Sequence, residues 1–313
     1  MPLPRPQLLE FGPDGKYLRE IGHNLYAWSF AHMVKVDPHD NIWVTDKGSD
    51  MVIKFTPEGR VAMVFGRKQE ASDEETGPLK HPKPPFPAEP GRFRQVTDVA
   101  FDGADNTFIS DGYINSRVAK VDKDGNWLKS WGERGNGPGQ FNTPHSIAVD
   151  AKGNVYVSDR GNHRIQVFDG EGNFLRQIVI DVPVPPSAKP AIGNIPGAAQ
   201  LAAGTFTPGS PWTTCITPGP NQVLYSADAW PGRIYKADAR WPSAGCARRE
   251  RQAVEAVRLD PRACLPLRER ALGRRAAELA RAKAGAAPVV KSHEIFQISR
   301  PKSASSVRLI YIC

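Results

Sequence analysis

The stretch HSIAVDAKGNVYVSD at residues 145–159 decides the fold, because the chain repeats its pattern twice more without a gap. The other copies are HMVKVDPHDNIWVTD at residues 32–46 and TDVAFDGADNTFISD at residues 97–111. In each copy apolar residues alternate with polar ones, as a half-buried antiparallel strand requires, and aspartates stand five residues in and at the fifteenth position. A unit of four short strands that recurs every ~40–50 residues is typical of a propeller blade.

Two further units fit the same pattern. TCITPGPNQVLYSAD at residues 214–228 is followed by Arg233, as Asp159 is followed by Arg164. At the start, LLEFGPDGKYLREIG at residues 8–22 matches the end of a unit, so we expect the chain to begin within its first blade. The sequence therefore predicts an all-β propeller with five recognisable units, of which the first is partial.

The positive charge of the chain is confined to one segment. The net charge is +8, but residues 239–313 hold 16 Lys and Arg against 6 Asp and Glu, so the remainder is slightly acidic. A basic surface that binds nucleic acid is therefore not expected on the propeller. No run of eighteen apolar residues is present, so we expect no membrane span, and no signal peptide opens the chain.

The repeats resemble those of NHL-repeat six-bladed propellers, specifically bacterial proteins similar to peptidyl-α-hydroxyglycine α-amidating lyase. The resemblance rests on AHMVKVDPHDNIWVTD, QVTDVAFDGADNTFISDGYINSRV, FNTPHSIAVDAKGNVYVSDRGNHRIQVF and PWTTCITPGPNQVLYSADAWPGRIYK, and covers about residues 7–238. It implies a zinc-dependent lyase that is monomeric, periplasmic or secreted, and binds a small-molecule or peptide substrate at the mouth of the channel.

The basic tail interrupts this pattern. We therefore divide the chain into a propeller at residues 1–238 and a tail of helix, coil or disorder at residues 239–313. Codons for residues 240–283 read one base later permit the last blade of the family, including its FGWIH motif, so we infer a frame change near residue 239. The alternative is a genuine basic C-terminal domain.

The first position of each repeat is a candidate metal position. These positions are His32, Thr97, His145 and Thr214, and the innermost strands of propeller blades bring such positions to one channel. With the histidine of FGWIH, His32 and His145 would form a three-histidine zinc site, which leaves a coordination position open for catalysis. Calcium is the second candidate metal. The alternative is that both are buried structural histidines.

Tyr113, in the motif SDGYINSR, is the candidate catalytic residue. It follows Asp111 by two residues, where the strand ends at the mouth of the channel. The resemblance implies that this tyrosine removes the hydroxyl proton of the substrate. A packing tyrosine is the alternative, and the sequence does not decide between them.

The recurring aspartates and arginines are predicted to be structural. We expect the aspartates to accept turn amide bonds and the arginines to bridge neighbouring blades to them, because both recur in several blades. His163 has no equivalent in other blades, and we expect it to be solvated. The structural set is Asp46, Asp111, Asp159 and Asp228 with Arg117, Arg164 and Arg233.

Two Pro-rich inserts at residues 68–92 and 181–211 are longer than ordinary blade connections. They cover the channel mouth or are solvated connectors. The sequence thus predicts an ancestral zinc-dependent amidating lyase, inactive in this chain because one ligand is lost. Its rivals are a non-catalytic NHL scaffold for protein or other ligands and a calcium-dependent lactonase-type propeller.

Overall fold

A computed structural model describes residues 8–12, 14–68, 88–184, 197–202, 206–238, 255–257, 296–299 and 308–312. The chain divides into two compact units, which we describe one at a time. The first comprises residues 1–82, 91–98 and 265–313, and the second comprises residues 83–90 and 99–264.

The first unit contains two four-stranded antiparallel sheets. One sheet has its strands in chain order: β3 (Ala31–Val36), β4 (Ile42–Asp46), β5 (Met51–Phe55) and β6 (Val61–Phe65). The other has the order β2-β1-β22-β21 and joins strands from distant parts of the chain. Its strands are β1 (Leu8–Phe11), β2 (Tyr17–Ile21), β21 (Phe296–Ser299) and β22 (Arg308–Ile312).

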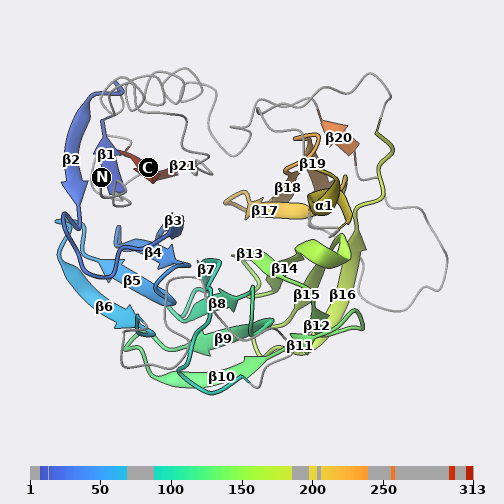
Figure 1. The fold of residues 1–313 in the computed structure, drawn as a ribbon, viewed down its shortest axis with the longest axis horizontal. Coiled ribbons are helices and arrows are strands. Elements are labelled where there is room, and N and C mark those ends of the chain that lie inside the picture. Colours follow the sequence, from blue (N-terminus) through green and yellow to red (C-terminus); the bar gives the residue numbers. More distant parts are fainter. Residues whose placement is uncertain are drawn as a thin grey trace. The chain divides into compact units, whose positions relative to one another are not determined.

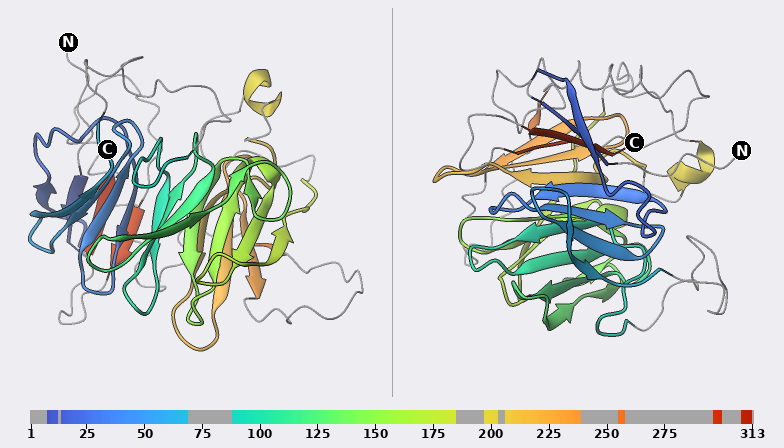
Figure 2. Two further views of the ribbon diagram at one scale, coloured as in Figure 1. Left: turned by 90° about the horizontal axis from the view of Figure 1, so that it is seen from below. Right: turned by 90° about the vertical axis from the view of Figure 1, so that its left-hand side faces the viewer.

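The second unit contains three such sheets, whose strands also follow chain order (Figures 1 and 2). The first is formed by β7 (Asp98–Phe101), β8 (Thr107–Asp111), β9 (Arg117–Val121) and β10 (Trp127–Trp131). The second is formed by β13 (Pro144–Val149), β14 (Val155–Asp159), β15 (Arg164–Phe168) and β16 (Phe174–Val179). The third is formed by β17 (Pro211–Ile216), β18 (Val223–Asp228), β19 (Ile234–Asp238) and β20 (Glu255–Val257).

Short elements connect these sheets. A two-stranded ribbon precedes β13, a 3-10 turn follows β14, and a helix of one to two turns precedes β17. They are β11 (Glu133–Arg134), β12 (Gln140–Phe141), η1 (Arg160–Asn162) and α1 (Ala198–Ala202). The prediction of an all-β propeller fold is confirmed, since the repeats that begin at residues 32, 97 and 145 each form a four-stranded antiparallel blade.

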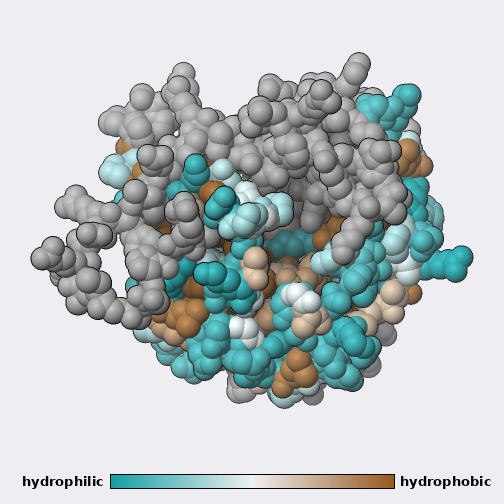
Figure 3. All heavy atoms as spheres, turned by 180° about the vertical axis from the view of Figure 1, so that it is seen from behind, coloured by the Kyte–Doolittle hydropathy of each residue, from teal (hydrophilic) through white to brown (hydrophobic). Residues whose placement is uncertain are grey.

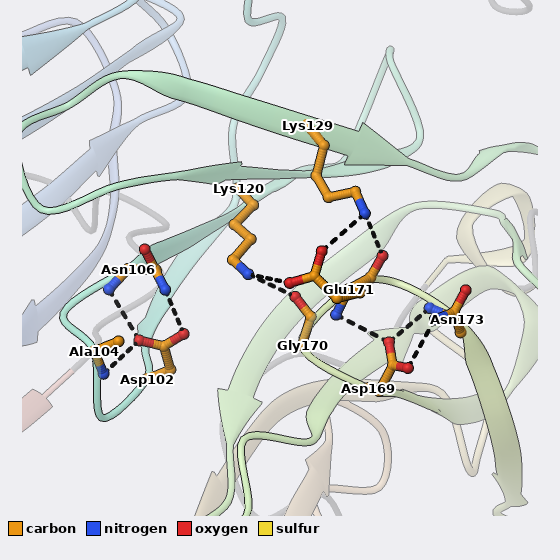
Figure 4. A network of polar contacts seen from close by, with 9 residues as sticks. All are labelled: Asp102, Ala104, Asn106, Lys120, Lys129, Asp169, Gly170, Glu171 and Asn173. Atoms are coloured by element: carbon orange, nitrogen blue, oxygen red, sulfur yellow. Dashed lines mark hydrogen bonds and ion pairs between the residues drawn. The ribbon is translucent and has the colours of Figure 1, made fainter.

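The aspartate that lies five residues into each repeat builds the first turn of the blade. In Asp102, one carboxylate oxygen accepts the amides of Ala104 and Asn106, and the other accepts the Asn106 side chain (Figure 4). The same three bonds recur at four other turns, which satisfies backbone donors that the strands leave unpaired. Those turns begin at Asp37, Asp122, Asp150 and Asp169.

One of these turns also joins two blades of the second unit. Lys120 on β9 reaches the carboxylate of Glu171 at 2.8 Å and the carbonyl oxygen of Gly170 at 2.9 Å (Figure 4). Lys129 on β10 reaches the same carboxylate at 3.1 Å. The turn between β15 and β16 is therefore held against the preceding blade by two lysines.

Apolar side chains fill the spaces between blades of the second unit. The core between the β7–β10 and β13–β16 sheets includes Phe108, Phe141 and Phe168, all fully buried. A second core joins the β13–β16 sheet to the β17–β20 sheet and includes Tyr156, Ile165 and Leu224. Alternate residues of each repeat thus face these cores, as the period-two pattern predicts.

The tail predicted at residues 239–313 supplies three short strands. β20 pairs with β19, and β22 pairs with both β1 and β21. The rest of the tail lies outside the described residues, as does most of the 68–92 insert. The boundary at residue 238 and the frame change stay predictions.

One face of the described residues is largely hydrophilic. Figure 3 shows teal residues over most of the coloured part of one face, with brown residues in scattered groups. Among the described helices, none has the length and apolar character needed to cross a membrane.

Candidate functional site

His145 is the centre of a polar and aromatic cluster in the second unit. It lies on β13, is 3% exposed, and its Nδ1 is 2.7 Å from the carbonyl oxygen of Trp212. A carbonyl oxygen only accepts, so Nδ1 carries the proton and donates it. In the neutral imidazole Nε2 is therefore the acceptor.

Tyr113 meets this acceptor from the neighbouring blade. It follows β8 by two residues, and its hydroxyl lies 3.1 Å from Nε2 of His145. Because Nε2 accepts, the Tyr113 hydroxyl donates its proton to His145. The two rings meet edge to face, with centroids 5.8 Å apart. The structure therefore brings the predicted catalytic tyrosine onto one of the predicted metal ligands.

Arg160 completes the cluster, and the sequence analysis did not identify it. It directly follows Asp159, is 6% exposed, and donates from an Nη to the Tyr113 hydroxyl oxygen at 3.2 Å. Its guanidinium lies over two rings, 5.2 Å from the centroid of Tyr113 and 4.6 Å from that of Trp212. The signal in the sequence was available, since Arg160 stands beside the recurring aspartate.

The charge of Arg160 is not neutralised within the cluster. Among the described residues no carboxylate pairs with it, and its buried Nε has no hydrogen-bond acceptor. A buried cation without an anionic partner is costly, so this guanidinium favours an anionic ligand. A carboxylate matches the planar donors of arginine.

The alignment that placed Thr214 in the channel position is wrong by two residues. Pro211 pairs with Asp228 as Pro144 pairs with Asp159, so Trp212 is the structural equivalent of His145. The turn after β17 is the cause. The amide of Thr217 bonds to Val223, six residues on, whereas the amide of Asp150 bonds to Asn154, four residues on.

His32 has the same local setting in the first unit. It lies on β3, is 5% exposed, and its Nδ1 is 2.8 Å from the carbonyl oxygen of Thr97. Thr97 is the first position of the next repeat, just as Trp212 is for His145. Both histidines thus donate Nδ1–H to the first residue of the next repeat, and their Nε2 atoms are set as acceptors.

These imidazoles fit a zinc site. Histidine ligands of metals characteristically donate their second ring nitrogen to a carbonyl or carboxylate, as both do here. The described residues contain no group of three or more metal-ligating side chains. The two histidines lie in different units, so their predicted convergence on one ion stays a prediction.

The recurring aspartates and arginines form ion pairs within blades. The Nε–carboxylate distance is 3.0 Å for Arg117 and Asp111, 2.8 Å for Arg164 and Asp159, and 3.4 Å for Arg233 and Asp228. Each aspartate and its arginine flank one hairpin, so these three ion pairs lie within a blade and do not join neighbouring blades as predicted. The arginines reach incoming segments through carbonyl oxygens instead, at Glu89, at Gly137 and Gln140, and at Val182 and Pro183.

Asp46 differs because no arginine follows it. Its carboxylate accepts the backbone amides of Ser29, Phe30 and Ser49. Burial raises the pKa of Asp46, and burial likewise raises the pKa of Asp159. These carboxylates hold the hairpins of their blades in place.

His163 is not solvated, contrary to the prediction. It is half-buried, and its Nε2 bonds to the Thr207 hydroxyl at 2.6 Å. Thr207 belongs to the second Pro-rich insert, which therefore contacts the hairpin that carries Arg160.

Residues 141–168 match the NHL repeat. A segment of 187 residues is 36% identical to "Peptidyl-glycine alpha-amidating monooxygenase A" of Xenopus laevis, over 56% of this chain and 18% of the relative. "NHL repeat-containing protein 3" of Homo sapiens is 31% identical over 176 residues, 52% of this chain and 45% of the relative.

A third relative, "Probable peptidyl-alpha-hydroxyglycine alpha-amidating lyase pgal-1" of Caenorhabditis elegans, is 30% identical over 159 residues, 50% of this chain and 41% of the relative. The matches span less than half the length of these curated relatives. The chain contains an NHL repeat, and its predicted resemblance to amidating lyases is confirmed.

Proposed function

We propose that the cluster around Tyr113 is the site of a zinc-dependent lyase that acts on N-acyl-α-hydroxyglycines. The reaction breaks the bond between the amide nitrogen and the hydroxyl-bearing carbon, and it yields an amide and glyoxylate. The observation that supports it best is the Tyr113 hydroxyl, held 3.1 Å from His145 and 3.2 Å from Arg160.

The proton balance of this cleavage suits the cluster. The substrate hydroxyl loses its proton and becomes the aldehyde of glyoxylate, while the departing nitrogen gains one proton, so no other reactant is consumed. With zinc on Nε2 of His145, the Tyr113 phenol would give up the proton that it shares with this nitrogen, and its oxygen would then be placed to take the substrate's hydroxyl proton. The Arg160 guanidinium stabilises negative charge that develops on the phenol oxygen.

Arg160 also suits the substrate. An N-acyl-α-hydroxyglycine and glyoxylate both carry a carboxylate, and Arg160 is a buried guanidinium without a carboxylate partner among the described residues. A bound carboxylate would neutralise it through charge-assisted hydrogen bonds.

His32 and His145 are the residues of this chain that would hold zinc. When bound, zinc supplies a Lewis acid that polarises the substrate hydroxyl oxygen. The described residues offer two imidazoles rather than the three that the resemblance implies, so we propose that turnover in this chain is slow while binding of the carboxylate ligand is retained.

The test combines turnover with binding. Purified chain with and without added zinc is incubated with N-benzoyl-α-hydroxyglycine, and glyoxylate release and ligand affinity are measured. We expect binding with slow, zinc-stimulated release, and we expect Tyr113→Phe to bind the ligand but lose release by about 100-fold, the usual scale for a proton-transfer residue.

Tyr156→Phe is the matched control, because Tyr156 also bonds an arginine but lies on β14 between the blades. It should leave both measurements unchanged. Absence of ligand binding, or equal release by Tyr113→Phe and the parent chain, would sink the proposal.

A further inference from the structure

The second Pro-rich insert ends against the functional cluster. Residues 206–212, which we call the 206–212 segment, run from this insert into β17. Phe206 packs edge to face on Trp212, with centroids 4.7 Å apart. Thr207 bonds to His163, and the Ser210 hydroxyl donates to the carbonyl oxygen of Arg160 at 2.7 Å.

Further bonds hold this segment to its own blade. The amide of Gly209 donates to the carboxylate of Asp228 at 3.2 Å, and Ser210 is fully buried. The 206–212 segment is therefore fixed both to β18, through Asp228, and to the hairpin that carries Arg160. The insert was expected either to cover the channel mouth or to be a solvated connector. The 206–212 segment is not a solvated connector.

Trp212 stands where the β3–β6 and β13–β16 blades place a histidine. By register it is the equivalent of His32 and His145. An indole there supplies a flat apolar face instead of a nitrogen acceptor. The Arg160 guanidinium lies over this ring, 4.6 Å from its centroid, and also lies 5.2 Å from the ring centroid of Tyr113.

Trp212 also contacts His145 in two ways. Its carbonyl oxygen accepts the Nδ1 proton at 2.7 Å, and the two ring centroids are 5.1 Å apart. One residue thus orients both groups that bond the Tyr113 hydroxyl. The carbonyl contact needs only the backbone, whereas the contact with Arg160 needs the aromatic ring.

We propose that Trp212 is a positioning residue that holds the Arg160 guanidinium against Tyr113, and that the 206–212 segment thereby sets the affinity of the site for carboxylate ligands. The role in ligand affinity rests on the function proposed above. Without the indole, Arg160 regains side-chain freedom that a ligand must then remove, and preorganisation of this kind raises affinity.

The first experiment measures the affinities of glyoxylate and of its neutral amide, glyoxylamide. Trp212→Leu should weaken glyoxylate binding about tenfold, as expected for loss of a buried cation–π contact, and leave glyoxylamide binding unchanged. Trp212→Phe retains a ring and should stay within about threefold of the parent chain. Phe206→Ala should fall between them, because Phe206 only supports the indole.

Trp127→Leu is the matched control. The Arg117 guanidinium lies 5.1 Å from the ring centroid of Trp127, and this pair joins β9 to β10 within one blade. We expect unchanged glyoxylate affinity. If Trp212→Leu binds glyoxylate as the parent does, or if Trp127→Leu loses as much affinity, Trp212 has no positioning role.

A second experiment tests the positioning without any ligand. The Nε–H proton of Arg160, assigned by its loss in Arg160→Lys, lies near two ring faces and should be shifted upfield by ring currents. Trp212→Leu should move this signal and Trp127→Leu should not. If the parent chain fails to bind glyoxylate while the shift behaves as expected, the proposed function falls and the positioning role stands; an unmoved signal overturns the role itself.

Discussion

The blades that carry His32 and His145 share their strands, their turn and the bond from Nδ1 to the next blade, but they differ beside the histidine. After Asp46 the chain continues with Lys47 and Gly48, and Lys47 lies 5.4 Å from the exposed ring of Phe30. After Asp159 comes Arg160, which is buried and lies over two aromatic rings. The common features build the blade, and the chemistry depends on one or two residues added to a hairpin.

The comparison extends to the carboxylates beneath these hairpins. Asp46 pairs across the hairpin with Met51 and is satisfied by backbone amides, whereas Asp159 pairs with Arg164. The same buried position is thus stabilised in two ways. Only the second depends on a side chain that a mutation can remove.

Removing that side chain should have the largest effect of the changes considered. Arg164→Met gives the β13–β16 blade the residue that the β3–β6 blade has, but it leaves Asp159 as a buried charge without its cation. We expect the free energy of unfolding to fall by about 3–5 kcal/mol, measured by urea denaturation. Lys152→Met, an exposed change in the same blade, is the control and should change little. A loss below about 1 kcal/mol for Arg164→Met would show that Asn162 and the backbone amide of Asn142 suffice for Asp159.

Replacing the residue that follows Asp159 or Asp46 tests whether only the β13–β16 blade binds a carboxylate. Arg160→Leu should weaken glyoxylate binding about 100-fold, because it removes a charge-assisted contact inside a buried site. Lys47→Leu changes the equivalent residue of the other blade and should stay within about twofold. Calorimetric titration gives the glyoxylate affinity of each variant relative to the parent chain. Similar losses of affinity for both variants would contradict the assignment of Arg160 to the site.

Zinc affinity tests what the two histidines share. Restoring the inferred reading frame near codon 239 should add a third histidine and raise zinc affinity on the order of tenfold or more, measured by competition with a chelator. In that restored chain His145→Ala should abolish the gain, whereas His163→Ala should preserve it. Equal zinc affinity before and after restoration would assign His32 and His145 a structural role only.

The smallest effect concerns the first turn of each blade. Trp43 donates to Asp37, and Tyr156, at the equivalent position, donates to Asp150. Burial raises the pKa of Tyr156 to about 12, whereas an indole does not titrate. Because the folded-state pKa lies above the unfolded value of ~10, stability from this group is present below pH ~10 and is lost as the pH rises toward 12. Tyr156→Phe should therefore flatten the alkaline decline in melting temperature, and Trp43→Phe should not.

The repeated pattern predicted each blade because its determinants are local. The aspartate of each turn bonds to residues two and four positions on, and alternating residues face the cores, so fifteen residues carry the information. His32 and His145 were identified in the same way, whereas Tyr113 was identified through the resemblance to amidating lyases. The pattern failed at Trp212, because a turn longer by two residues shifts the register of the strand without altering the spacing of apolar residues enough to be noticed.

The sequence by itself determined the number of recognisable repeats, their turns and the histidines that share a register, since each depends on neighbours within one blade. The tertiary structure alone decided that Tyr113, His145, Arg160 and Trp212 form one cluster. These residues come from three blades, up to 99 positions apart in the chain, and their contacts arise where hairpins and first strands of successive blades pack together. Local periodicity carries no information about which side chains meet there, because that depends on turn length and on the packing between sheets.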